Sequence, residues 1–373
     1  MNIGNRKSLV KHSYQAQDVT FLLTDLTGKI EEVTIEEKER LIAQGVSYSE
    51  MISKEEAPQN SMVKLFKQMT EEKQVKLADY IRVLSESIYL EKEGSVVLVS
   101  LARAGTPFGI LIKRYLEQKY QIKVPHYSVS IIRGRGIDEE ALKWIIERHP
   151  SQAIQFVDGW TGKGSIIDEL ERSIIQFNRN YGVEVSSELA VLADPARRCR
   201  LYGTHLDINI PNGCLNSTVS GLISRTIYRP DLMEVGDFHG AISLDRLEDV
   251  DDSQWFVSKV SDAFMFDDLT PSERHSILGR QTYPNYAKLV AKQIQATYAV
   301  QDLHKIKLSV GESARVLLRR KPRLLLIRQM ESTETLHLVQ LAHERQVPIQ
   351  LMKDDEGGHY QAIALIEEAD GHE

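Results

Sequence analysis

The sequence predicts an α/β protein: a parallel sheet with helices on both faces, followed by a small C-terminal α/β domain. Continuous apolar segments of strand length alternate with helical patterns between residues 96 and 193. Small and charged residues follow these segments, as expected for loops at one edge of such a sheet. Charge also changes along the chain. Residues 231–274 hold 12 acidic and 3 basic residues, whereas 303–329 hold 8 basic residues and 1 acidic residue, which indicates separate modules.

Four strands and three helices are expected in the main part of the chain. The strands are predicted at 96–101, 124–132, 153–157 and 189–193, and the helices at 108–117, 138–148 and 165–180. Apolar strands without alternation are typical of sheets covered on both faces. In such sheets ligands bind beyond the carboxyl ends of the strands, so the loops there are the candidate site.

The remaining residues divide into an extension and a second domain. Residues 1–60 are interpreted as an N-terminal extension packed on a main domain of residues 61–302, and residues 303–373 as the C-terminal domain. Within the last part, helices are expected at 312–320 and 335–345, and strands at 323–327, 349–352 and 362–366. A further helix is expected over 62–90, where apolar residues recur at helical spacing.

Composition bounds the class of protein. The 373 residues are 42% hydrophobic and 27% charged, with a net charge of −7, which argues against wholesale coating of nucleic acid. No apolar run approaches the roughly 18 residues that a membrane span needs, so no membrane partner is expected. The 2 cysteines cannot form a disulfide framework, and the first 15 residues are polar. We therefore expect a cytoplasmic protein.

Two loops have the composition of phosphate sites. The loop after the strand that ends at Val157, here called the second loop, combines an acid, glycines, hydroxyls and a lysine. It lies at a predicted helix start, where backbone N–H groups attract anions. Its candidate residues are Asp158, Gly159, Trp160, Thr161, Gly162, Lys163, Gly164 and Ser165. The first loop follows the strand at 96–101 and offers Arg103, Ala104, Gly105 and Thr106. Together they suggest a grip on a molecule with phosphates on both sides of a sugar. The alternative is two ordinary strand-to-helix turns.

Polar residues further along could complete this site. Asp194 ends the fourth predicted strand and could contact a base or Mg²⁺, although Asp before Pro is equally a helix start signal. A loop dense in hydroxyl and amide groups then contributes Asn216, Ser217, Thr218 and Arg225 as a hood over an acceptor. The alternative for this loop is a structural turn with its hydroxyls satisfied.

The two loops resemble those of type I phosphoribosyltransferases. Residues 96–105 resemble that family's pyrophosphate loop, and residues 157–165 resemble its loop for the diphosphate sugar PRPP. The family carries two adjacent acids after the strand, whereas this chain has Gly159 in the second position and a shorter loop, which weakens binding of ribose hydroxyls and metal. The resemblance implies transfer of a phosphoribosyl group from PRPP to a small acceptor such as a base, with Mg²⁺ as cofactor. Asp158 would hold ribose and metal, and Arg103 and Lys163 would stabilise charge. A homodimer is a further expectation.

A closer resemblance covers nearly the whole chain. Residues 45–51, the Asp158 loop and residues 211–222 resemble the StiP family, found beside bacterial tellurite-resistance and stress-response genes and described both as cysteine protease and as phosphoribosyltransferase-like. Residues 311–348 resemble a Pelota-type, L7Ae-like RNA-binding domain. That resemblance implies RNA as a partner, with Arg315, Arg319 and Arg320 as candidate phosphate contacts; the alternative is a solvated basic helix.

Two other functions are compatible with the sequence. A cysteine hydrolase would use Cys214 as nucleophile, His205 or His239 as base, and Asn209 or Asn216 to orient it. Cys214 is equally compatible with a small buried or loop residue. A non-catalytic regulator would sense PRPP or another nucleotide through the same loops and bind RNA through the C-terminal domain.

Overall fold

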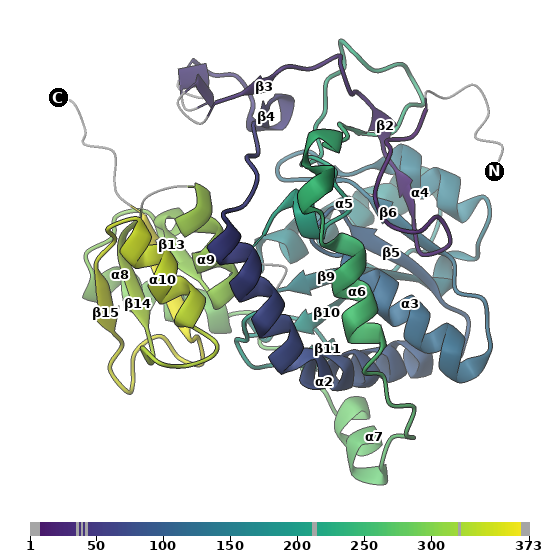
Figure 1. Cartoon of the computed structure of the whole chain (residues 1–373). Coiled ribbons are helices and arrows are strands. Elements are labelled where there is room, and N and C mark those ends of the chain that lie inside the picture. The colour runs from purple at the N-terminus through teal and green to yellow at the C-terminus, as the bar shows by residue number, and fades with distance from the viewer. Residues whose placement is uncertain are drawn as a thin grey trace.

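A six-stranded parallel sheet forms the centre of the molecule (Figure 1). The computed structural model describes residues 8–34, 37–38, 40–41, 44–210, 215–319 and 322–366. The strands lie in the order β1-β6-β5-β9-β10-β11, and every neighbouring pair is parallel. Their bounds are β1 (Thr20–Leu22), β5 (Val97–Leu101), β6 (His126–Val129), β9 (Ile154–Trp160), β10 (Leu189–Ala193) and β11 (Leu201–Thr204). The predicted parallel sheet is confirmed.

Helices cover both faces of this sheet because its strands are apolar on both sides. Leu98 belongs to the core beneath α2 (Asn60–Glu91), α3 (Thr106–Tyr120) and α6 (Ser253–Ser261). Its neighbours Val97 and Val99 belong to the core beneath α4 (Glu139–Ile146) and α5 (Ser165–Tyr181). Successive residues of a strand point to opposite faces, so this alternation places one core on each side.

The N-terminal residues contribute a strand to the sheet itself. β1 pairs with β6 as the edge strand, so residues 1–60 do more than pack against the main domain. Short pairs continue above the sheet: β2 (Thr24–Asp25) with β12 (Gly240–Ala241), and β3 (Glu32–Val33) with β4 (Ile52–Ser53). A hairpin of β7 (Ile131–Ile132) and β8 (Gly136–Ile137) follows β6.

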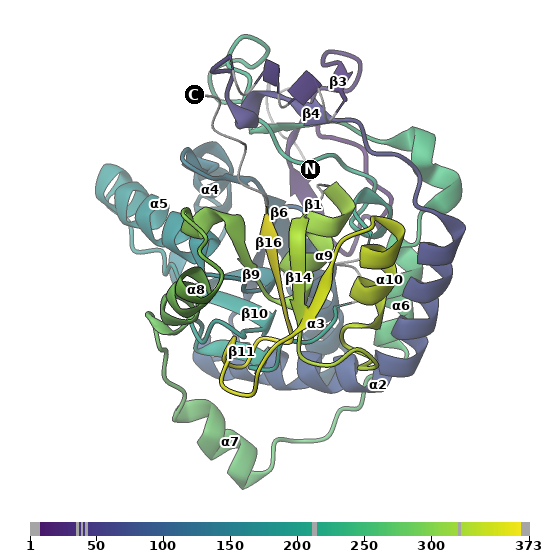
Figure 2. The same ribbon diagram turned by 90° about the vertical axis from the view of Figure 1, so that its left-hand side faces the viewer.

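The C-terminal residues form a second sheet of four strands. Its order is β13-β16-β14-β15, with β14 and β15 parallel and the other pairs antiparallel. The strands are β13 (Ile306–Leu308), β14 (Pro322–Ile327), β15 (Ile349–Leu351) and β16 (Ala362–Ile366), and the helices α8 (Tyr286–Thr297), α9 (Val310–Arg319) and α10 (Leu336–Glu344). Seen from its own side, this domain lies in front of β9 and β10 (Figure 2). Strand β13 is the one element of this sheet that the sequence pattern did not predict.

Short helices complete the chain. α7 (Pro271–Leu278) projects from the bottom of Figure 1 and begins with a capping box between Thr270 and Glu273. Short 3₁₀-helices occur at η1 (Tyr48–Glu50), η2 (Ser151–Ala153), η4 (Ser217–Val219), η5 (Asp245–Val250) and η6 (Leu303–Lys305). Among the residues described, no helix is both long and apolar enough to cross a membrane.

Candidate functional site

The two predicted phosphate loops lie side by side at the carboxyl edge of the main sheet. A Cβ atom added to Gly105 would lie 2.4 Å from the carbonyl oxygen of Val157 and 3.0 Å from Cα of Asp158. Such distances are below van der Waals contact, so the first loop needs glycine in order to press against the end of β9.

The backbone of the first loop is occupied by its own turn. The N–H of Gly105 donates to Leu101 O at 3.0 Å, and that of Thr106 donates to Arg103 O at 3.1 Å. The Thr106 hydroxyl is fully buried and bonds the Ser128 hydroxyl at 2.8 Å. These N–H and hydroxyl groups therefore donate to other groups of the protein, so they do not point at an anion as predicted.

Arg103 points away from the second loop. Its guanidinium donates to Ile223 O at 2.5 Å and pairs with the carboxylate of Glu55. The same carboxylate accepts the backbone N–H of Ser217 at 3.1 Å. Arg103 and Glu55 thus tie the first loop to the predicted hood.

The second loop is a surface on which the C-terminal domain rests. The hydroxyl of Tyr360 donates to Gly162 O at 2.9 Å, and Lys163 Nζ donates to Leu303 O at 2.5 Å. A Cβ on Gly162 would lie 2.8 Å from the Glu312 side chain, so α9 lies directly against the loop. Burial, with Lys307 and Arg133 nearby, lowers the pKa of Lys163 to about 8. Gly162 and Lys163, two of the predicted phosphate contacts, thus bond the C-terminal domain in this structure.

Gly159 and Trp160 also differ from their predicted role, because β9 continues through both of them. Trp160 is buried, with Gly311 packed on its ring and the Arg315 guanidinium 4.4 Å from the ring centroid. Gly159 lies against the Phe108 ring. Both residues therefore pack against other elements of the fold, Gly159 against α3 and Trp160 against α9. Gly164 has a left-handed backbone with φ of 90°, next to the Arg198 side chain, and directly precedes Ser165, the first residue of α5.

Asp158 is half-buried within β9, two residues before the strand ends. Its carboxylate accepts the N–H of Gly159 at 2.8 Å, and desolvation raises its pKa to about 6. Magnesium would need several hard oxygen ligands near this carboxylate. Among the described residues no group of three or more His, Cys, Asp and Glu side chains is arranged to hold a metal ion. The nearby acid Glu312 of α9 also raises the pKa of this carboxyl, and Gly159 stands where the transferase family has its second acid.

Asp194 organises the turn after β10. Its carboxylate accepts the Thr161 hydroxyl at 2.7 Å and the Cys199 N–H at 2.8 Å. The Thr161 hydroxyl in turn accepts the N–H of Ala196 at 3.1 Å. Asp194 is fully buried, and burial raises its pKa. The predicted acceptor contact is thus replaced by a structural network, and no helix begins at Asp194.

The hood residues line a cavity of about 590 Å³. Leu215, Asn216, Ser217 and Thr218 form one wall, together with Arg103 and Arg225. Arg225 donates to Tyr48 O at 2.7 Å, and its guanidinium lies 3.4 Å from the centroid of the Tyr48 ring. The hood therefore borders a chamber, and the residue after Cys214 is part of its lining.

Of the two cysteines, the structure describes Cys199. Cys199 is buried at 3% exposure, and burial raises the pKa of its thiol well above the usual value. Cys214 lies outside the described residues. The flanking chain is anchored at both ends: Asn209 N–H donates to Glu334 at 2.5 Å, and Ser217 N–H to Glu55 at 3.1 Å.

The candidate bases lie elsewhere. His205 Nδ1 lies 2.9 Å from Asp194 O, and its ring lies tilted against that of Tyr202 with the centroids 3.8 Å apart. His239 Nδ1 lies 2.9 Å from the Ser130 hydroxyl. Burial lowers the pKa of both imidazoles. Neither lines the cavity beside Leu215, and the side-chain amide of Asn209 contacts Met69 Sδ.

Of the three predicted RNA contacts, the structure describes the side chain of Arg315 alone. Arg315 pairs with Glu312 at 3.2 Å and lies over Trp160, at the boundary between the domains. Arg320 and the Arg319 side chain lie outside what the structure describes.

Sequence reasoning missed Asp207, an acid that joins the two domains. Asp207 is buried, and its carboxylate accepts the N–H groups of Val310 at 3.0 Å and Gln361 at 2.8 Å, both from the C-terminal domain. Burial raises its pKa to about 7. Its position between Leu206 and Ile208 was the available signal, because an acid among apolar residues needs buried partners.

Comparison with known proteins agrees with this two-part arrangement. A family model described as "Tellurite-like stress resistance cysteine protease StiP" matches residues 12–261. The chain belongs to the StiP family. A curated StiP protein of Acinetobacter baylyi, named "Cysteine protease StiP", is 36% identical over 364 residues, covering 95% of this chain and 94% of that protein. A second model, described as a PELOTA RNA binding domain, matches residues 286–368, so the C-terminal domain is Pelota-like.

These matches overturn the predicted transferase activity. The StiP family and its curated member are both named for cysteine protease activity, not for transfer from PRPP. The internal bonds of the first loop and the covered second loop agree with that correction. PRPP, its acceptor and magnesium were predicted only as the substrates and cofactor of that transferase.

Proposed function

We propose that this StiP-family chain is a cysteine-dependent peptide hydrolase with Cys214 as nucleophile, acting in a tellurite-like stress response in the cytoplasm. The observation that supports Cys214 is the state of the other cysteine. The chain has 2 cysteines, and Cys199 is only 3% exposed, with its thiol pKa raised by burial. Because the attacking species is the thiolate, a buried neutral thiol is unreactive. Cys214 is then the remaining candidate for the nucleophile.

Charge near the cavity favours such a reaction. Cations lower the pKa of a neighbouring thiol, and Arg103 and Arg225 line the cavity that Leu215 also lines. The thiolate would attack the carbonyl carbon of the scissile amide and form a thioester as the C–N bond breaks, and the leaving amine would take up the proton that the thiol released on ionising. Water would then hydrolyse the thioester and restore the thiol. The proposal rests on the thiol and these cations, since His205 and His239 contact other residues.

The first prediction concerns the two cysteines. We expect a fluorescent peptide with a thiol-reactive electrophile to label the wild type and Cys199→Ala, and to leave Cys214→Ala unlabelled. Peptide hydrolysis should fall by at least about a thousandfold in Cys214→Ala, because removing a nucleophile leaves only binding and charge effects. Mass spectrometry of the labelled peptide and a fluorogenic assay provide the two readouts.

Cys199→Ala is the matched control, since it removes a thiol of the same chain from a buried site. Circular dichroism should show both variants folded. Labelling or hydrolysis that persists in Cys214→Ala would remove Cys214 as nucleophile.

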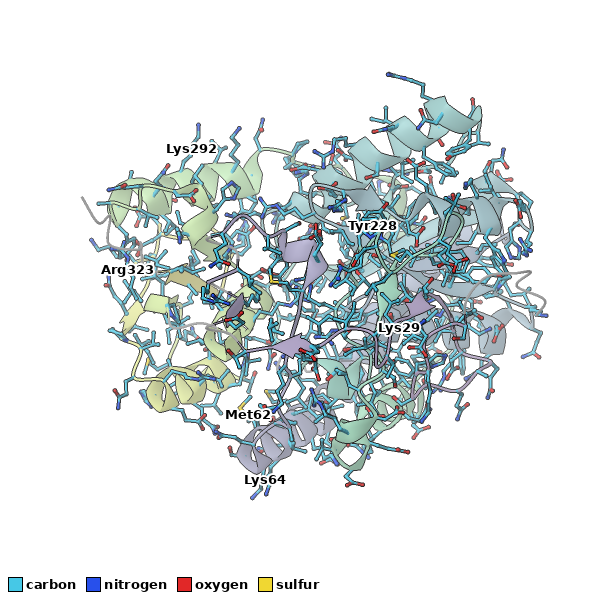
Figure 3. All side chains as sticks on the ribbon, turned by 90° about the horizontal axis from the view of Figure 1, so that it is seen from above. Lys29, Met62, Lys64, Tyr228, Lys292 and Arg323 are labelled. Carbon is cyan, nitrogen blue, oxygen red and sulfur yellow. The ribbon has the colours of Figure 1, made fainter. Side chains whose placement is uncertain are left out.

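We also propose that the C-terminal domain binds structured RNA. Support comes from the Pelota match and from basic side chains on its outer side, where Figure 3 shows Lys292 and Arg323 pointing away from the main domain. Both are exposed, with Arg323 donating one bond to Tyr298 O at 2.7 Å. Contacts with RNA phosphates rely on such side chains.

The second prediction tests that surface. Lys292→Glu should weaken binding of a structured RNA by about three- to tenfold and reduce the salt dependence of binding by about one phosphate contact. Filter binding across a salt series measures both. Lys29→Glu, an exposed lysine of the main domain, is the control and should bind as the wild type does. Equal losses in the two variants would assign the effect to net charge instead of this surface.

We further propose that the main sheet is of the phosphoribosyltransferase type in topology, without that activity. β5 is flanked by β6 on one side and β9 on the other, so the crossover direction changes at β5. The loops after β5 and β9 meet at this switch point, where α/β sheets place their ligands. A solved structure superposed on such enzymes would test the assignment.

A further inference from the structure

One buried polar group in the lining of the cavity beside Leu215 makes no hydrogen bond. Thr218 lines this cavity and is 3% exposed, and its hydroxyl has no partner among the described residues. No other described side chain of the lining has a buried nitrogen or oxygen atom without a partner. Buried hydroxyls are almost always bonded, because an unbonded one destabilises the folded protein. The Thr218 hydroxyl is therefore an exception that a ligand or a reaction would explain.

Two other hydroxyls of the same stretch are bonded within the protein. The Ser220 hydroxyl donates to Asn216 O, and the Ser224 hydroxyl donates to Arg225 O at 2.8 Å. The turn therefore has backbone carbonyls within reach of its side chains. Thr218 differs from these two serines because its hydroxyl uses none of them.

The backbone on which this hydroxyl sits is fixed from two sides. The carbonyl oxygen of Thr218 accepts the N–H of Asp252, the N-cap residue of α6, at 2.8 Å. The N–H of Ser217 donates to the Glu55 carboxylate at 3.1 Å, and Glu55 pairs with Arg103. With the backbone held, the hydroxyl moves only between the staggered positions of χ1. The fold thus positions Thr218 and leaves its donor unbonded.

Thr218 is also close along the chain to the proposed nucleophile. Leu215, which directly follows Cys214, lines the same cavity. Four residues of chain extend over at most about 14 Å. The 3₁₀-helix η4 (Ser217–Val219) takes up part of this length and shortens the span. A peptide in the cavity can therefore meet both the thiol and the Thr218 hydroxyl.

Hydrolysis of an amide by a thiolate needs a hydrogen-bond donor at one particular atom. When the thiolate adds to the carbonyl carbon, the new S–C bond displaces the π-electron pair onto the carbonyl oxygen, which becomes negatively charged. A donor held at that oxygen stabilises the charge as it forms. A donor already bonded in the free protein would first have to break its bond, whereas an unbonded one is ready to donate.

We propose that the Thr218 hydroxyl donates a hydrogen bond to the oxyanion that forms at the scissile carbonyl, and that Thr218 is thus a catalytic residue of the hydrolase. This inference rests on the proposed function. As the electron pair returns, the C–N bond breaks and the amine takes up the proton that the thiol released. Thr218 keeps its own proton throughout. The unbonded hydroxyl of the free protein is then a loss of stability that serves the reaction.

The experiment compares variants of the full chain on a fluorogenic peptide that the wild type cleaves. Thr218→Val keeps the size and shape of the side chain and removes the donor. Its kcat should fall by about 10²–10³-fold with KM changed by less than about threefold, because the bond is made only in the transition state. Thr218→Ser restores a hydroxyl at the same position and should regain most of the wild-type kcat.

Two reagents separate the oxyanion from the thiol itself. Iodoacetamide alkylates a thiolate by displacing iodide, and no charged carbonyl oxygen forms. Intact-mass kinetics should therefore show Cys214 alkylated equally fast in the wild type and in Thr218→Val. A peptide aldehyde of the substrate's sequence instead adds the thiol to its carbonyl group. Its affinity, measured by protection from iodoacetamide, should fall at least about tenfold in Thr218→Val.

Thermal unfolding separates a catalytic role from a structural one. Thr218→Val should unfold at the wild-type temperature or above it, because valine buries no unbonded polar atom. Thr24→Val is the matched control: it makes the same change at a buried threonine whose hydroxyl donates to Phe238 O at 2.8 Å. That variant should unfold at a lower temperature and keep its kcat. If Thr218→Val does not fold, Thr218→Ala and Thr218→Ser provide a pair that differs by the hydroxyl alone.

Each outcome decides a different claim. A Thr218→Val protein with the wild-type kcat overturns the inference and keeps the hydrolase. The inference is also overturned if Thr218→Val loses as much stability as Thr24→Val, or if its alkylation slows as much as its hydrolysis. A wild type that cleaves no peptide, or cleavage that persists in Cys214→Ala, removes the proposed function and this inference with it. Loss of kcat and of aldehyde affinity, with alkylation and stability retained, supports Thr218 as the oxyanion donor.

Discussion

Replacing Asp207 by Ala should cost roughly 2–4 kcal/mol of stability and loosen the C-terminal domain from the main domain. The carboxylate accepts the N–H of Val310, the first residue of α9, and that of Gln361, just before β16. A helix N-terminus has no intrahelical partner for its first N–H groups, so Asp207 acts as the cap of α9 from another domain. Thermal unfolding and limited proteolysis measure the two effects.

The control is Asp354→Ala, which removes an exposed acid from the same domain. It should leave both the melting temperature and the proteolysis pattern within experimental scatter, because substitutions at such surface positions usually change stability by less than about 0.5 kcal/mol. If Asp207→Ala behaves like Asp354→Ala, the two hydrogen bonds do not hold the domains together.

Asp207 also gives the protein a pH dependence with a definite sign. Burial raises its pKa from 3.8 to about 7 in the folded chain. Between these values the folded chain binds more protons than the unfolded chain, so this group's contribution to the free energy of unfolding falls as pH rises from about 4 to about 7. Asp207→Asn removes the titration, and its deficit relative to the wild type should therefore shrink between pH 5 and pH 8.

The sheet was predictable because its strands are continuous apolar runs. Residues 96–101 and 189–193 have that pattern, and β5 and β10 occupy nearly the same positions. Three short strands of the two sheets, β1, β11 and β13, were not predicted, and β11 has only four residues with Gly203 among them. β1, at the sheet edge, has three residues, too few for a periodic pattern, and Lys307 interrupts the apolar residues of β13. Their partners β6 and β16 are distant in sequence, so pairing decides their conformation.

The site was harder to predict because the C-terminal domain packs on its loops and bonds to them. Residues 158–165 have the composition of an anion loop, but the sequence alone does not tell that Tyr360 and Glu312 will cover Gly162. Asp207 illustrates the same gap, since its partners lie more than a hundred residues away. Local composition predicted where the strands end and which ligands the following loops could bind. The packing of the two domains determined which polar groups of those loops are not already bonded within the protein.

Docking also explains how one molecule can combine the two proposed activities. Glu334 from the C-terminal domain pairs with Lys73 of α2 at 2.7 Å and accepts the N–H of Asn209 at 2.5 Å. Asp207 and Asn209 are therefore both fixed by the Pelota-like domain, and both precede Cys214 in the chain. The same domain supplies the basic residues Lys307 and Arg345 of the cavity. The position of this domain thus bears on the proposed hydrolase site independently of any RNA.

Replacing Gly105 by Ala should cost roughly 3 kcal/mol or prevent folding, the largest effect expected for a single methyl group in this chain. The added Cβ would meet three backbone atoms, Val157 O at 2.4 Å, Asp158 Cα at 3.0 Å and Leu101 N at 3.1 Å. Backbone atoms cannot rotate aside as a side chain can, so β9 must move away from the loop. Urea unfolding compares this variant with Gly279→Ala, where the nearest atom to the added Cβ lies at 3.4 Å and the site is exposed. A Gly105→Ala protein as stable as Gly279→Ala would show that the two loops do not press together at the switch point of the sheet.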